Sequence, residues 1–177
     1  MADEIAPQES QASAPELDPA QIEYLRQRLD SEQNLPLALV AGGAAALAGA
    51  AAWAGVTVVT GYQIGFMAIG VGFLVGFAVR SLGKGVTNTF GIVGAFWSLI
   101  GCALGNLLAV TALVAREQGV PFGSAVSQLN WDLIQQLMVA FFSPMDLLFY
   151  GIALYYGYRL AFRRLTGEEL EQMLTGG

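Results

Sequence analysis

Residues 35–60 carry no acidic or basic side chain, and this feature constrains the fold more than any other in the chain. A helix of about 20 apolar residues crosses the ~30 Å hydrocarbon core of a bilayer, so this run is long enough to span a membrane. Three further apolar runs follow, at residues 62–80, 90–115 and 144–162. We therefore expect an all-α protein, an integral membrane four-helix bundle with short amphipathic surface helices.

The segments outside these runs differ from them in composition. Of the 14 acidic residues, eight lie within residues 1–34, beside frequent Ala, Pro, Gln and Ser. The first part of this segment can bury too little apolar surface to offset its chain entropy. Asp18 followed by Pro19 is typical of a helix start. The predicted organisation is a disordered acidic tail at 1–17, a cytoplasmic amphipathic helix at 18–34, a membrane domain at 35–162 and a cytoplasmic C-terminal tail at 163–177.

Residues 122–142, between the third and fourth spans, have a mixed pattern. Apolar side chains recur at about 100° per residue on one face, and Gln and Asp side chains occupy the other. We interpret this as one helix lying in the membrane interface, with Trp131 at headgroup depth. The alternative is a re-entrant pore helix, which needs a water-filled cavity to shelter its backbone.

The distribution of basic residues predicts the orientation. Cytoplasmic loops of membrane proteins are enriched in Lys and Arg. With the N-terminus in the cytoplasm, seven of the 8 basic residues lie inside and only Arg116 lies outside. The seven inside are Arg26, Arg28, Arg80, Lys84, Arg159, Arg163 and Arg164. We expect a multi-pass protein with both termini in the cytoplasm.

Small residues recur at helical spacing in the second and third spans. In the second span they are Gly61, Gly65, Ala68, Gly72 and Gly76, and in the third they are Gly91, Gly94, Ser98, Gly101, Gly105 and Ala109. The second-span set falls within a sector of about 80°. Because no hydrophobic force joins helices in lipid, close contact through small residues supplies packing energy. We expect spans one to three to form a tight core and the bulkier fourth span to face lipid or another subunit. A glycine-lined groove for a ligand or lipid, or contacts between subunits, are the alternatives.

Polar side chains at membrane depth are few, and they offer little chemistry. Asn106 is the one amide within the third span, and Gln63 lies near the turn before the second, so these two form a candidate polar path. The chain has no histidine and a single cysteine, Cys102. We therefore expect no metal, no cofactor and no catalytic residue. The net charge of −6 argues against nucleic acid as a partner.

Trp53 and the stretch Thr60 to Arg80 (TGYQIGFMAIGVGFLVGFAVR) carry a family resemblance. In these residues the chain resembles an uncharacterised family of small bacterial four-span integral membrane proteins, over roughly residues 36–112. The resemblance implies a protein of the bacterial cytoplasmic (inner) membrane. It implies no activity and no catalytic residue.

Two functions are compatible with these features. The first is a non-enzymatic membrane scaffold or accessory subunit, which acts through small-residue helix packing in a homo-oligomer or a larger membrane complex. The second is a small channel or transporter, with a path lined by the glycine ridges and Asn106. An enzyme is the least favoured class, because it needs an acid–base pair and only Glu117, Asp132, Asp146 and Arg116 are available on the outer side.

Overall fold

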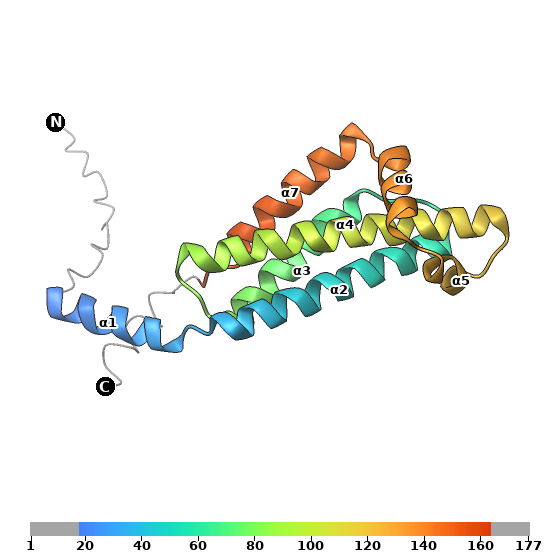
Figure 1. The fold of residues 1–177 in the computed structure, drawn as a ribbon. Coiled ribbons are helices and arrows are strands. Elements are labelled where there is room, and N and C mark those ends of the chain that lie inside the picture. The colour runs from blue at the N-terminus through green and yellow to red at the C-terminus, as the bar shows by residue number, and fades with distance from the viewer. Residues whose placement is uncertain (1–17, 164–177) are drawn as a thin grey trace, which may run out of the picture. The chain divides into compact units, whose positions relative to one another are not determined.

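The computed structural model describes residues 18–163, and all regular structure in that range is α-helical. The long helices follow from apolar runs, and side-chain caps at Asn34, Asn130 and Ser143 mark the starts of α2, α6 and α7. Figure 1 shows the seven helices. They are α1 (Pro19–Glu32), α2 (Leu35–Thr60), α3 (Phe66–Gly83), α4 (Asn88–Gln118), α5 (Phe122–Ser127), α6 (Trp131–Phe141) and α7 (Pro144–Leu160). The predictions for residues 1–17 and for residues 164–177 lie outside the described residues.

The chain divides into two compact units, one of which includes residues 18–31 and the other residues 32–165. In the first unit, the backbone N–H groups of Gln21 and Ile22 donate to the carbonyl of Asp18, at 2.9 and 3.0 Å. The helix expected at 18–34 is therefore α1, which begins at Pro19 and ends at Glu32.

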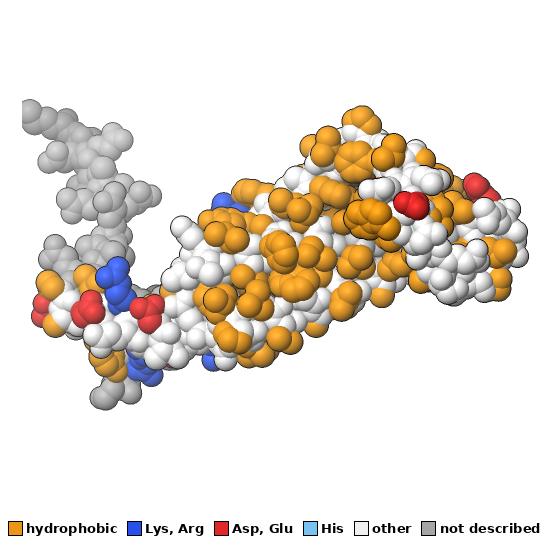
Figure 2. Space-filling view, in the orientation of Figure 1, with side chains coloured by type: hydrophobic (Ala, Val, Ile, Leu, Met, Phe, Trp, Pro, Cys, Tyr) orange, Lys and Arg blue, Asp and Glu red, His pale blue; other side chains and the backbone are white. Residues whose placement is uncertain are grey.

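Three helices of the second unit are long and apolar enough to cross a membrane: α2, α3 and α4, with 26, 18 and 31 residues. A fourth crossing is present if α6 and α7 count as one span, and the two helices are bent by 101° relative to each other. Figure 2 shows hydrophobic and uncharged side chains along the bundle, with charged side chains only toward its ends. The fold is therefore an all-α membrane helix bundle, as the sequence predicts.

Helix α7 packs along α3 and α4, so the expectation that the fourth span lies outside the core is wrong, although its opposite face stays exposed (Figure 1). A side chain added to Gly65 of α3 would meet the ring of Phe149, and one added to Gly76 would meet Leu160. The two contacts follow the same order along both helices, so α7 runs parallel to α3 and covers the same depth. Because α7 packs against two of the first three spans, the core consists of four helices and not of three.

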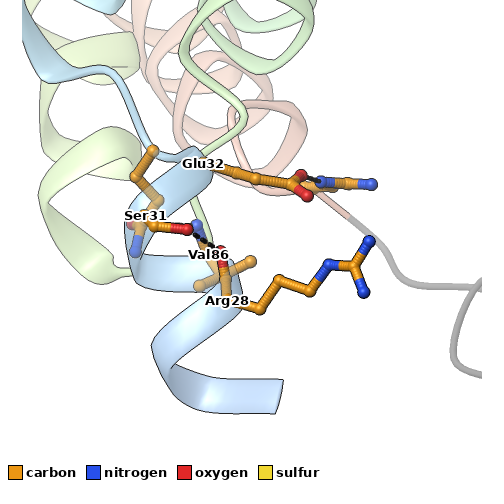
Figure 3. Close-up of polar contacts among 6 residues, drawn as sticks. Arg28, Ser31, Glu32 and Val86 are labelled. Atoms are coloured by element: carbon orange, nitrogen blue, oxygen red, sulfur yellow. Dashed lines mark hydrogen bonds and ion pairs between the residues drawn. The ribbon is translucent and has the colours of Figure 1, made fainter. Parts of the chain in front are cut away.

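The two ends of the bundle unit meet, and Figure 3 shows the contacts around Glu32. The carboxylate of Glu32, just before α2, pairs with the guanidinium of Arg163, just after α7, at 2.7 Å. The backbone N–H of Asn34 donates to the carbonyl of Gly83, and that of Arg163 to Gly85, both at 2.9 Å. We call this end of the bundle, which holds residues 32–34, 83–87 and 163, the junction end. The chain thus enters and leaves the bundle at the same end.

Two connections differ from the prediction. The second span begins at Phe66 and not at residue 62, because Gly61 ends α2 in the left-handed conformation (φ 72°) and residues 61–65 form the turn. The single interfacial helix expected at 122–142 is two helices, α5 and α6. The break falls where the Asn130 side chain accepts a hydrogen bond from the backbone N–H of Leu133, at 2.8 Å, and so caps a new helix start.

Candidate functional site

The small residues of α3 pack against α7. A side chain on Gly72 would collide with the backbone of Ala153, at 2.7 Å from its Cα, and one on Gly76 would meet the carbonyls of Tyr156 and Gly157. Ala68 is fully buried in the same core. The α3 ridge therefore lets two helix backbones approach closely within one chain.

The small residues of α4 are divided between two neighbouring helices. Gly91 faces the rings of Tyr158 and Phe162, and Gly94 and Ser98 lie against Gly157, so this half of the ridge meets α7. The other half lies mainly against α2: a side chain on Gly101 would meet Ala46 of α2 as well as Val71 of α3, and one on Gly105 would meet the ring of Trp53. Ala109 is fully buried. Faces that could have served contacts between subunits are thus used inside the protomer.

The matching surface of α7 is a row of small residues that sequence reasoning overlooked. Ala153, Gly157 and Ala161 are buried and are spaced four residues apart, so they lie on one face at the end of the helix. The bulky Leu147, Leu148 and Tyr155 point away from this face and are exposed. The four-residue spacing was visible in the sequence, but the frequent aromatic residues nearby obscured it.

Gly61 does not belong to the α3 ridge, contrary to the prediction. It ends α2, where a side chain would meet the guanidinium of Arg116 at 2.5 Å. Its left-handed φ is a conformation that only glycine adopts without strain. Gly61 therefore serves the turn that leads from α2 into α3, and the ridge proper starts at Gly65.

The two candidate polar residues meet in a direct hydrogen bond. Gln63 Nε2 donates to Asn106 Oδ1 at 2.5 Å, which ties the 61–65 turn to α4. On the neighbouring α7, the Tyr150 hydroxyl donates to the carbonyl of Cys102 at 3.2 Å. The nearby Asp146 is buried and accepts from the backbone N–H of Ser143 at 2.8 Å, in a capping box that starts α7. The hydrogen bond joins the two amides directly. A path along them for a transported species stays a prediction.

Within residues 18–163, one small-residue face has no partner, and it lies on α2. Ala44, Ala48, Ala51 and Gly55 are all exposed and are spaced four, three and four residues apart. They form a stripe about 60° wide. A side chain on Gly55 would meet nothing within 4 Å. We call these four residues the α2 stripe.

The described residues 18–163 contain no group of three His, Cys, Asp or Glu side chains that could hold a metal ion. Searches of family models, curated proteins and solved structures find no match to this chain. The resemblance of Trp53 and residues 60–80 to small bacterial membrane proteins therefore stays a prediction.

Proposed function

We propose that the protein is a non-enzymatic integral membrane scaffold or accessory subunit that binds a second copy or a larger membrane complex through the α2 stripe. The observation that carries this proposal is the uneven use of the small residues. The ridges on α3, α4 and α7 are filled by contacts within the chain, whereas the α2 stripe is exposed along about three helical turns.

A stripe of this kind suits a helix partner in lipid. Small side chains let another helix approach closely enough for extensive van der Waals contact, and small residues four apart are common at membrane helix interfaces. The stripe lies on a helix without charged residues, and exposed Val40 and Val59 flank it with apolar surface. A partner helix can therefore bind there without burying a charge.

The proposed location is the bacterial cytoplasmic membrane, with the junction end toward the cytoplasm. Four basic residues lie in the segments that meet at this end, namely Arg80, Lys84, Arg159 and Arg163. At the opposite end Arg116 is the basic residue within the described part of the bundle. This asymmetry supports the orientation, because positive residues favour the cytoplasmic side.

The experiment uses cross-linking in native membranes. Ala48→Cys places a thiol on the α2 stripe, while the native Cys102 is fully buried and out of reach of the reagent. We expect a cross-linked dimer, or a cross-link to a second protein. Adding Gly55→Leu should abolish the product, because a bulky side chain keeps the backbones apart.

Gly70→Leu is the matched control. Gly70 is also exposed, on α3, and a side chain there would meet nothing within 4 Å. The cross-link should survive this change. A chain that stays monomeric in native membranes and carries no co-purifying protein would refute the proposal, as would equal loss in both leucine variants.

A further inference from the structure

The exposed face of α7 carries a groove that the bundle does not use. Leucines line one end of this groove, tyrosines line the other, and Gly151 lies between them. The volume of the groove is about 460 Å³. Lining residues are Leu147, Leu148, Gly151, Ile152, Tyr155 and Tyr156. A side chain on Gly151 would meet nothing within 4 Å, so the notch exists because this position has no side chain.

A single positive charge stands beyond one end of this groove. The guanidinium of Arg159 lies over the ring of Tyr155, at 5.9 Å from its centre. Residues four and eight apart share one face of a helix, so Arg159, Tyr155 and Gly151 point to the same side of α7. In the described part of the chain no carboxylate lies within 4 Å of this guanidinium. The Arg159 side chain is exposed, so its guanidinium is accessible from the membrane surface.

The spacing of these features matches one half of a bilayer. At 1.5 Å per residue, Arg159 is about 12 Å along the helix from Gly151 and about 18 Å from Leu147. One leaflet of a ~30 Å hydrocarbon core is about 15 Å deep. A guanidinium at headgroup level therefore has an apolar groove below it that extends to about the middle of the membrane.

We propose that this groove binds an anionic phospholipid, whose phosphate contacts Arg159 and whose acyl chain lies in the notch at Gly151. The positive charge of Arg159 favours an anionic lipid over an uncharged partner. Guanidinium groups bind phosphate oxygens through paired hydrogen bonds. A second copy bound symmetrically to the same face would bring two Arg159 side chains together, and their repulsion disfavours that arrangement. The α2 stripe has no such charge, so the lipid site is separate from the proposed protein contact.

The test measures which lipids the full-length protein retains. The purified protein is equilibrated in mixed micelles with equal amounts of phosphatidylglycerol and phosphatidylcholine, and bound lipids are counted by native mass spectrometry. The wild-type protein should retain mainly phosphatidylglycerol. Arg159→Gln should lower this preference about fivefold, since one arginine near an anionic lipid surface contributes about 1 kcal/mol.

Two further variants make the result specific. Gly151→Leu fills the notch, so it should reduce the number of retained lipids of both kinds. Arg116→Gln removes a charge at the opposite end of the bundle and should leave the phosphatidylglycerol preference unchanged. The proposal is overturned if Arg159→Gln keeps the wild-type preference or if Arg116→Gln lowers it equally. It is also overturned if a Gly151→Cys variant cross-links to a second copy in native membranes. None of these three results depends on the α2 stripe.

Discussion

Substitution of Gly72 by alanine, compared with the same substitution at Gly70, tests whether α7 packs into the bundle. The two glycines lie two residues apart on α3. A methyl group at Gly70 would meet nothing within 4 Å, whereas one at Gly72 would lie 2.7 Å from Cα of Ala153 and 2.9 Å from its carbonyl carbon. Both variants gain the same helix propensity from alanine, so the difference between them isolates the contact with α7.

The size of that difference follows from the geometry. Carbon atoms in contact are normally about 3.5–4.0 Å apart, so the backbone of α7 must move away by roughly 0.8 Å. A gap of that size removes about a quarter to a half of the attraction between the atoms it separates. Extra methyl groups in packed cores typically cost about 1–3 kcal/mol. We expect Gly72→Ala to be less stable than Gly70→Ala by this amount.

Thermal unfolding in one detergent, followed by tryptophan fluorescence, measures the effect. Since 1 kcal/mol shifts the Tm of a domain of this size by about 2–4 °C, the two variants should differ by about 2–12 °C. The α2–α4 contacts do not involve Gly72, so cross-links between those helices should be retained. Equal melting temperatures, or a higher one for Gly72→Ala, would show that α7 does not pack on this ridge.

Two other predictions concern the turn after α2 and the glycines that end α2 and α4. A double-mutant cycle with Gln63→Leu and Asn106→Leu should give a coupling free energy of about 0.6 kcal/mol and at most about 1.7 kcal/mol, the range for hydrogen bonds between membrane helices. A coupling free energy of zero would show that the hydrogen bond between these two side chains does not stabilise the turn. Gly61→Ala and Gly119→Ala should each lower stability by roughly 1–2 kcal/mol, because both glycines have left-handed φ angles of 72° and 67°. Chemical unfolding curves give both values, and a neutral Gly61→Ala would contradict the second prediction.

The sequence predicts the helices well because hydropathy and caps act locally. The limits of α2 follow from the charge-free run 35–60, and the start of α7 follows from Ser143 and Pro144. The break near Asn130 was missed because the apolar period continues through it. An asparagine can either continue a helix or cap a new one. The local sequence pattern alone does not determine which of the two occurs at Asn130.

The partners of each helix face were harder to predict than the helices. Small residues indicate a close approach, but they do not say to which neighbour. Gly94 and Gly105 belong to one ridge, yet the first meets α7 and the second meets α2. Between residues 41 and 55 of α2, every residue except Leu47 and Trp53 is Ala or Gly, so the exposed Ala48 and the buried Ala46 look alike in sequence. Only the three-dimensional packing separates the occupied faces from the open one.

The close contact between Gly94 and Gly157 has a consequence for biosynthesis. The two glycines are 63 residues apart, and ribosomes add about 5–20 residues per second, so the first waits about 3–13 s for the second. During that interval the α3 ridge and the part of the α4 ridge around Gly94 lack the helix that covers them. A nascent chain interrupted before Pro144 leaves them uncovered, and the last helix of a neighbouring copy has the right shape to fill them. Completion of α7 therefore decides whether the bundle closes on itself or exchanges a helix with another chain.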